Sequence, residues 1–295
     1  MQRPRFDTLS AARTALSANG FNLNASRSSH IEGNFAAMPG FRLFPRSRRV
    51  AACVAAALAA VAIPSAVHAG EVRVAVAANF TAAAREIGAL FENSTGHRAV
   101  FSFGSTGQLY TQIGQDAPFE VFLAADRARP KKAADEGLAV PGSRFVYATG
   151  RIVLFSRDKS LVRGAATLQE GKFTRIAIAN PATAPYGAAA VEAMKALGVH
   201  DALRARLVRG NNVAQTYNFV ATGNAEIGFV ALSQLAGHDR GSRWIVPAGL
   251  HSVIAQDAVL LKRGAHNPAA RAFVAFLKGP EARRVTEKYG YGSGD

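Results

Sequence analysis

Short β-type runs alternate with helical patterns after residue 70, and this alternation constrains the fold more than any other feature of the sequence. In the stretch VAVAANFTAAAREIGALF, residues 74–91, an extended pattern ends at Asn79 and a helical one begins at once. There, Phe80, Ala84 and Ile87 recur at helical spacing on one face. Strands that alternate with helices through short connections are typical of α/β folds with mainly parallel sheets flanked by helices, and this is the predicted fold class.

The alternation occurs twice along the chain, which predicts two lobes. The expected strands are 71–77, 99–103, 121–124, 145–150, 152–156, 175–179, 227–230 and 253–261. The expected helices are 80–92, 108–113, 126–135, 186–197, 213–222, 268–277 and 281–289, with a further helix from Leu232. Because the last strand and two helices follow a complete second set, we expect them to return to the first lobe. The predicted lobes are 70–148 plus 254–295 and 149–253, with crossovers near 147–156 and 252–260 and a ligand cleft between the lobes.

The N-terminal segment 1–69 has the pattern of an extension followed by an export signal. Residues 46–69 read RSRRVAACVAAALAAVAIPSAVHA, in which arginines precede a short apolar run that ends in Val67-His68-Ala69. This order predicts a signal peptide cleaved after Ala69 and a periplasmic protein. The alternative is a buried helix or a retained anchor. Residues 1–37 show no periodicity, so they are either a disordered extension or precede a true start at Met38.

Charge and cysteine content exclude several function classes. The whole chain has a formal net charge of +15, but residues 1–69 hold eight arginines and two acids. The 27 basic and 18 acidic residues that remain give +9, and the basic ones are scattered without interleaved aromatics, so no nucleic-acid partner is predicted. The single cysteine, Cys53, lies inside the predicted signal. A mature chain therefore has no disulfide, thiolate metal site or cysteine nucleophile.

Four junctions between a strand and a helix carry the candidate binding residues. Their central residues are Asn79 in AANF, Ser105 in GSTG, Tyr186 in APYG and Val213 in NNVA, with Ala78 and Thr106 beside the first two. In open α/β sheets, ligands bind beyond the carboxyl ends of strands, and free N–H groups at helix starts favour an anion there. None of the four junctions holds a charged side chain. Neutral donors of this kind suit a fully deprotonated oxyanion, which accepts hydrogen bonds and donates none.

A purely structural interpretation of the same residues stays open at this point. Asn79 and Ser105 are favoured helix caps, Tyr186 is a common packed aromatic, and Val213 is a common core residue. Asp126, in AADRARP, is interpreted as a helix cap.

Several of these stretches resemble the periplasmic molybdate-binding proteins of ABC transporters. The matching stretches are VAVAANFTAAAREIGALFENSTGH, FSFGSTGQLYTQI, APFEVFLAAD, AIANPATAPYGAAA, AEIGFVALSQ and FVAFLKGPEARRVTEKYGY. The resemblance covers 71–291 and implies a type II periplasmic binding fold that closes two lobes on molybdate or tungstate. It further implies delivery to an inner-membrane permease with a separate ATPase, a monomeric receptor, and no cofactor.

The resemblance also implies a set of ligand contacts. Asn79, Ser105, Tyr186 and Val213 fall on the family's binding positions, where they would contact oxyanion oxygens rather than the metal itself. Ala78 stands where the related branch usually has threonine. Ala231 stands where many members have a ligand tyrosine, which leaves Tyr186 to supply a hydroxyl.

Two other functions are alternatives to molybdate or tungstate binding. A receptor for sulfate or phosphate is the alternative within the same class, because tetrahedral oxyanions differ mainly in size. An enzyme is not predicted: the seven histidines are scattered, no pair has metal-ligand spacing, and no G-x-S-x-G elbow or phosphate loop occurs.

Overall fold

The computed structural model describes residues 69–237 and 239–292. These residues belong to one compact unit, Pro64–Asp295. The predicted extension and signal peptide, with Cys53, lie outside the described residues. No helix in the described part of the chain combines the length and the apolar character needed to span a membrane.

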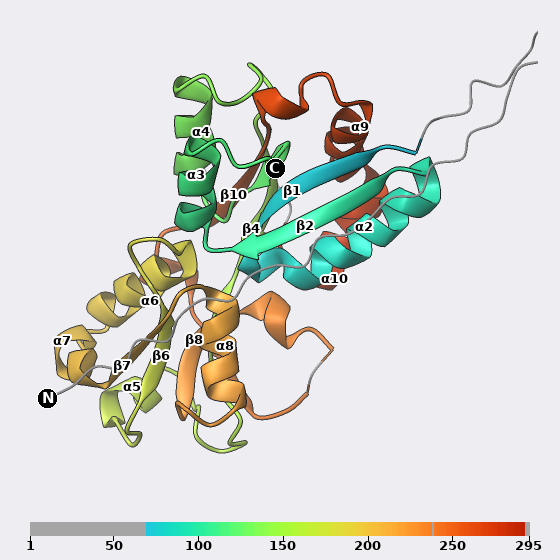
Figure 1. Cartoon of the computed structure of the whole chain (residues 1–295). Helices are drawn as coiled ribbons and strands as arrows, with labels where there is room; N and C mark the ends of the chain where they lie inside the picture. Colours follow the sequence, from blue (N-terminus) through green and yellow to red (C-terminus); the bar gives the residue numbers. More distant parts are fainter. Residues whose placement is uncertain (1–68, 238, 293–295) are drawn as a thin grey trace, which may run out of the picture. The chain divides into compact units, whose positions relative to one another are not determined.

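The first of two five-stranded sheets has the order β2-β1-β3-β10-β4. Its strands are β1 (Glu71–Ala77), β2 (Arg98–Gly104), β3 (Val121–Leu123), β4 (Phe145–Gly150) and β10 (Ile254–Leu260). Figure 1 shows β10, from the C-terminal part of the chain, among strands from the N-terminal part. The C-terminal strand therefore returns to the first lobe, as the sequence predicts.

The second sheet has the order β7-β6-β8-β5-β9. Its strands are β5 (Ile152–Ser156), β6 (Ile176–Ala179), β7 (Leu207–Gly210), β8 (Ile227–Ala231) and β9 (Ser242–Ile245). The sequence analysis missed β9, because SRWI has only two apolar residues and pairs at the edge of the sheet, where polar residues are tolerated.

Both sheets are mixed in the same way. β10 pairs antiparallel with β3 and with β4, while β1 pairs parallel with β2 and β3. β5 pairs antiparallel with β8 and β9, while β6 pairs parallel with β7 and β8. In each sheet, one strand runs against the other four. The predicted two-lobed α/β fold is confirmed, and its sheets are mainly parallel apart from this reversed strand.

Helices flank both sheets. The α-helices are α2 (Thr81–Thr95), α3 (Thr106–Gly114), α4 (Ala128–Asp135), α5 (Ala166–Glu170), α6 (Pro185–Ala196), α7 (His200–Leu203), α8 (Val213–Ala221), α9 (Pro268–Leu277) and α10 (Pro280–Lys288). Short 3-10 helices are η1 (Ala78–Phe80), η2 (Arg204–Arg206), η3 (Leu232–Leu235), η4 (Ala248–Leu250) and η5 (Lys262–Gly264). The helix predicted from Leu232 is thus a single 3-10 turn, and the sequence analysis missed α5 and α7, which are too short to show helical periodicity.

The chain passes between the two sheets at neighbouring positions. β4 ends at Gly150 in the first sheet and β5 begins at Ile152 in the second, so Arg151 alone separates them. The return runs from Ile245 to Ile254, which pairs with Gly150 across β4 and β10. Sheet membership supports the predicted lobe boundaries, which stay a prediction.

Aromatic residues hold the core of the first lobe next to the first strand–helix junction. Phe80 packs edge-on against Tyr147, with ring centroids 4.9 Å apart, and against Tyr291 at 5.2 Å. All three side chains are buried. Edge-to-face aromatic pairs stabilise beyond the burial of their area, so Phe80 fixes the start of α2 firmly against the sheet.

Gly150 lies where the chain leaves the first sheet, and it admits no side chain. A Cβ built on it would lie 2.2 Å from the Tyr186 hydroxyl oxygen and 2.7 Å from Nε2 of Gln256. We expect Gly150→Ala to lower the free energy of unfolding by about 1–3 kcal/mol, the usual cost of overpacking. Urea denaturation measures this change, with Gly249→Ala as the control because a Cβ on Gly249 meets no atom within 4 Å. Equal stability of the two variants would contradict the prediction.

Candidate functional site

Ser105 follows β2 and occupies the N-cap position of α3, with extended backbone angles of φ −73° and ψ 148°. Its side chain makes no capping hydrogen bond. The hydroxyl oxygen is buried and has no hydrogen-bond partner among the described residues. A buried hydroxyl without a partner costs free energy, and such groups are typical of binding sites. The helix-cap interpretation of this side chain is therefore wrong.

Asn79 lies in the η1 turn after β1 and is 3% exposed. Its amide nitrogen donates to Oε1 of Gln256 at 2.8 Å and to the hydroxyl of Tyr291 at 3.0 Å. An amide NH₂ group has two hydrogens, so both are engaged inside the protein. The expectation that Asn79 offers side-chain donors to a ligand is thus at odds with this arrangement. Its backbone N–H lies in the first turn of η1, where intrahelical acceptors are lacking, and is the donor that remains.

A closed ring of hydrogen bonds begins and ends on Asn79. Its amide donates to the Tyr291 hydroxyl, which lies 3.0 Å from Oγ of Ser233, and Ser233 donates to the backbone carbonyl of Asn79 at 2.8 Å. Burial raises the pKa of the Tyr291 hydroxyl, which therefore stays protonated near neutral pH. Ring-like networks of this kind fix the groups they connect, so they orient the η1 turn.

Sequence reasoning missed the residues of this network, because they lie far from Asn79 along the chain. Tyr291 is 212 residues away, Gln256 is 177 and Ser233 is 154. Tyr147 extends the network by donating to Ala124 O at 3.0 Å, and its hydroxyl lies 3.1 Å from Gln256 Oε1. The available signal was polar residues inside otherwise apolar segments, as at Gln256 within IAQDAVL.

Tyr186 is the second residue of α6, directly after Pro185. Its hydroxyl lies 3.4 Å from Nε2 of Gln256, within the same inter-lobe network. Burial raises its pKa well above the usual value for tyrosine, so the hydroxyl remains a neutral donor. The backbone N–H of Tyr186 belongs to the first helical turn, which has no intrahelical acceptors.

Val213 is the first residue of α8, and the cap before it is fully formed. Asn212 Oδ1 accepts from the backbone N–H of Gln215 at 3.0 Å, and Gln215 Oε1 accepts from the N–H of Asn211 at 2.6 Å. The cap thus uses the N–H of the third helical residue and leaves that of Val213 for another acceptor. The Val213 side chain is buried in the second lobe's core, which confirms the core interpretation, whereas contact of its backbone N–H with a ligand stays a prediction.

One small cavity brings all six predicted residues together. It is lined by Ala77, Ala78, Asn79, Gly104, Ser105, Thr106, Ala125, Ala184, Pro185, Tyr186, Asn212 and Val213. None of these lining residues carries a charged side chain. Residues from both lobes contribute, and Ala125 is a lining residue that the sequence analysis did not name.

The electrostatics of this cavity come from backbone dipoles. The N-termini of α3, α6 and α8 meet there, supplied by residues Thr106, Pro185 and Val213. Each helix is at least nine residues long, so each presents unpaired N–H groups and the positive end of its dipole. Helix N-termini that converge in this way are a favourable environment for a compact anion, even without a fixed positive charge. Groups of three or more His, Cys, Asp or Glu suited to a metal ion are not found in the described part of the chain.

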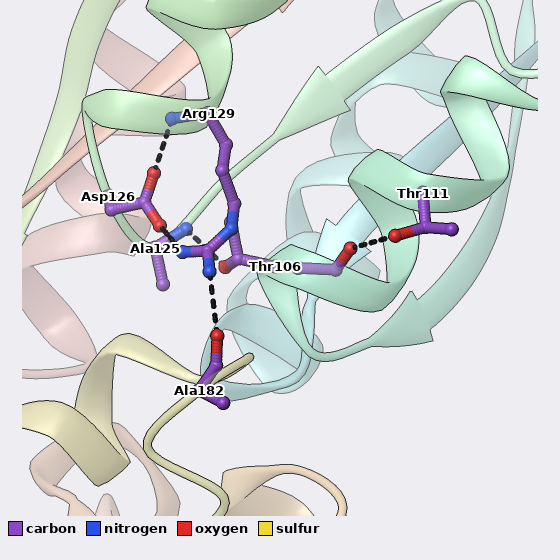
Figure 2. Close-up of polar contacts among 7 residues, drawn as sticks. Thr106, Thr111, Ala125, Asp126, Arg129 and Ala182 are labelled. Carbon is purple, nitrogen blue, oxygen red and sulfur yellow. Dashed lines mark hydrogen bonds and ion pairs between the residues drawn. The ribbon is translucent and has the colours of Figure 1, made fainter.

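Thr106 and Asp126 shape the loop that borders the cavity (Figure 2). The Thr106 hydroxyl accepts from the backbone N–H of Ala125 at 3.0 Å. Asp126 Oδ1 accepts from the N–H of Arg129, in the first turn of α4, at 2.9 Å, but α4 begins at Ala128 and its N-cap position is Arg127 rather than the predicted Asp126.

Comparisons with known proteins agree on one family. The model of the bacterial extracellular solute-binding protein family matches residues 72–292. The molybdate-binding protein ModA of Rhodobacter capsulatus is 53% identical over 248 residues, covering 84% of this chain and 98% of that protein. The molybdate-binding protein ModA of Azotobacter vinelandii is 51% identical over 253 residues, with the same two coverages.

Solved structures give the same result. The periplasmic molybdate-binding protein of Azotobacter vinelandii superimposes with a TM-score of 0.73 and 39% identity, over 75% of this chain and 98% of that one. The sulfate-binding protein SubI of Mycobacterium tuberculosis has a TM-score of 0.62 at 13% identity, over 77% of this chain and 88% of that one, a likeness of fold alone.

The unpartnered hydroxyl of Ser105 predicts an unusual stability change. Ser105→Ala removes a buried donor that has no partner, so we expect the unliganded protein to gain about 1 kcal/mol in free energy of unfolding. Ser156→Ala is the matched control, because the buried Ser156 hydroxyl donates to Glu226 O at 2.7 Å and accepts from Asp158 N at 3.1 Å. That variant should lose about 1–2 kcal/mol. Urea unfolding without ligand distinguishes the two, and a clear loss in Ser105→Ala would contradict the assignment.

Proposed function

Because this chain belongs to the bacterial extracellular solute-binding protein family, we propose that it binds molybdate in the cavity around Ser105 and delivers it to an ABC permease. The observation that carries the proposal is the buried, unpartnered Ser105 hydroxyl in a cavity without charged side chains. The two relatives that are 53% and 51% identical are molybdate-binding proteins by name, which supports the same ligand here.

The donor chemistry of the cavity suits a fully deprotonated tetrahedral oxyanion. The proposed ligand contacts are all donors: the Ser105 hydroxyl and the backbone N–H groups of Asn79, Tyr186 and Val213. No lining side chain is a carboxylate that could accept a hydrogen bond from a protonated oxyanion. Molybdate and tungstate carry no proton near neutral pH and meet this requirement, whereas monohydrogen phosphate does not. Sulfate meets it too and is distinguished by its smaller size. We propose tungstate as a second ligand on the same donors.

Selectivity without a countercharge has a physical reason. In a closed, dry cavity each oriented dipole acts more strongly than in water, because the dielectric screening is lower. The anion is then held through its oxygens, so the protein needs no resident cofactor and contacts no metal directly. A lysine or arginine in the same place would add a long-range attraction for every small anion, and so would bind anions less selectively.

We further propose a periplasmic, monomeric receptor that docks on an inner-membrane permease driven by a separate ATPase. The family's extracellular character supports the location, and the signal-like segment 46–69 supports export. Family membership is that of a binding protein, so no catalytic role is assigned to any residue of the cavity.

Calorimetric titration of the purified protein with molybdate, tungstate, sulfate and phosphate tests the proposed ligand. We expect one-to-one binding of molybdate and tungstate, with little heat from sulfate or phosphate. If sulfate alone binds, the ligand is sulfate and not molybdate. If none of the four anions gives binding heat, the proposal of an oxyanion receptor is refuted.

Val213 allows the deletion of a single backbone donor. Proline is well tolerated at the first helical position, and Asn212 already has the extended conformation, φ −152° and ψ 175°, that a following proline requires. Val213→Pro should therefore weaken molybdate binding about tenfold or more, since one N–H to a charged group is lost. Val213→Ala is the control for the trimmed side chain and keeps the N–H. Calorimetry compares them, and equal affinities would remove Val213 from the site.

A further inference from the structure

Two hydrogen bonds join the lobes beside the cavity. Arg129, from α4 of the first lobe, donates from Nη2 to the backbone carbonyl of Ala182 at 3.1 Å. The backbone N–H of Gly107, in α3 of the same lobe, donates to the carbonyl of Thr183 at 2.8 Å. Ala182 and Thr183 lie in the loop between β6 and α6 of the second lobe. Figure 2 shows Arg129 reaching from its own helix to the Ala182 loop.

Arg129 is held in place before it reaches the other lobe. Asp126 accepts the Arg129 backbone N–H at 2.9 Å and, through its other carboxylate oxygen, accepts from Nη1 at 2.5 Å. The guanidinium fork binds Asp126 with one nitrogen and Ala182 with another, so it is oriented by its neighbour. Asp126 also neutralises the charge of Arg129. The guanidinium therefore acts on the other lobe through this directed hydrogen bond more than through long-range electrostatic attraction.

This pair of contacts is connected to the turn that contains Ser105. Thr106 accepts the N–H of Ala125, which fixes the loop that carries Asp126. Gly107 follows Thr106 directly and makes the second contact itself. Arg129 does not line the cavity, whereas Ser105, Thr106 and Ala125 do. The residues that surround the anion are therefore only one or two contacts away from the bonds that join the lobes.

We propose that Arg129 and Gly107 form an inter-lobe latch, defined by their bonds to Ala182 and Thr183, that keeps a bound oxyanion from leaving. The proposal rests on the proposed oxyanion-binding function. Arg129 is a positioning residue, because it touches neither the cavity nor its contents. An anion enclosed by both lobes leaves only after the lobes separate, which breaks both latch bonds. The latch thus governs the dissociation rate and leaves entry into the open form unaffected.

Gly107 provides an independent test of the same latch. A Cβ built on it would lie 3.0 Å from Cα and 3.1 Å from the carbonyl oxygen of Thr183, and 3.2 Å from Nη2 of Arg129. Alanine has the higher helix propensity of the two residues, so Gly107→Ala favours α3 while it crowds the lobe contact. If Gly107→Ala releases the ligand faster without a loss of folding stability, the effect comes from the crowded contact between Gly107 and Thr183.

The test measures release of radiolabelled molybdate into an excess of unlabelled molybdate, together with the association rate. Arg129→Ala and Gly107→Ala should each raise the dissociation rate about tenfold, as expected for one lost or strained hydrogen bond, while the association rate changes less than about twofold. Arg129→Lys keeps the charge but lacks the fork, so it should also release molybdate faster than the native protein. Lys131→Ala removes a charge from the same helix, where Lys131 forms an ion pair with Asp135, and should match the native rates.

The outcomes separate the latch from the function on which it rests. Native dissociation rates in Arg129→Ala and Gly107→Ala would overturn the latch while molybdate binding stands. A slower, salt-dependent association in Arg129→Ala with unchanged dissociation would also overturn it, because that result indicates electrostatic steering. Absence of molybdate binding to the native protein would instead refute the proposed function. Thermal unfolding of each variant verifies that it is folded.

Discussion

The amide group of Asn79 is the interaction on which the arrangement of the site depends. One buried NH₂ group ties the first strand–helix junction to Gln256 in β10 and to Tyr291 after α10, and Tyr291 connects to Ser233 of the second lobe. A buried amide left without these partners would destabilise the fold, so breaking any bond of the network costs free energy. The network also binds the backbone carbonyl of Asn79, which accepts from Ser233. The side chain of Asn79, which the sequence suggested as a ligand donor, instead has a structural role.

The cavity combines two kinds of rigid element. Its walls are the first turns of helices that follow the carboxyl ends of β1, β2, β6 and β7. Small side chains of the first lobe pack in the apolar cluster of the second lobe, namely those of Ala77, Ala78 and Ala125. Small residues let the lobes approach closely, and the N–H groups are then fixed in direction rather than recruited by flexible side chains. Fixed dipoles of this kind can favour an anion in a site without charge, as the proposed function requires.

Much of the fold followed from sequence periodicity, and the site followed in part. Strands such as Ile152–Ser156 and helices such as Pro268–Leu277 have continuous apolar patterns, so both were predicted with their observed ends. The positions of Ser105 and Val213 followed from their place after a strand. What local patterns could not show is which atoms of Asn79 are already engaged, since its partners come from segments more than 150 residues away. The bond between Arg129 and Ala182 also joins separate segments, 53 residues apart along the chain, so local patterns could not show it either.

Tyr291 follows α10, whereas its hydrogen-bond partner Asn79 follows β1, and 212 residues separate the two. Bringing together groups so distant along the chain costs loop entropy, so the ring forms only where β1, η1 and α10 are packed in one lobe. The orientation of the η1 turn is therefore a property of the folded lobe as a whole, and a disturbance at Tyr291 reaches Asn79 through a single hydrogen bond.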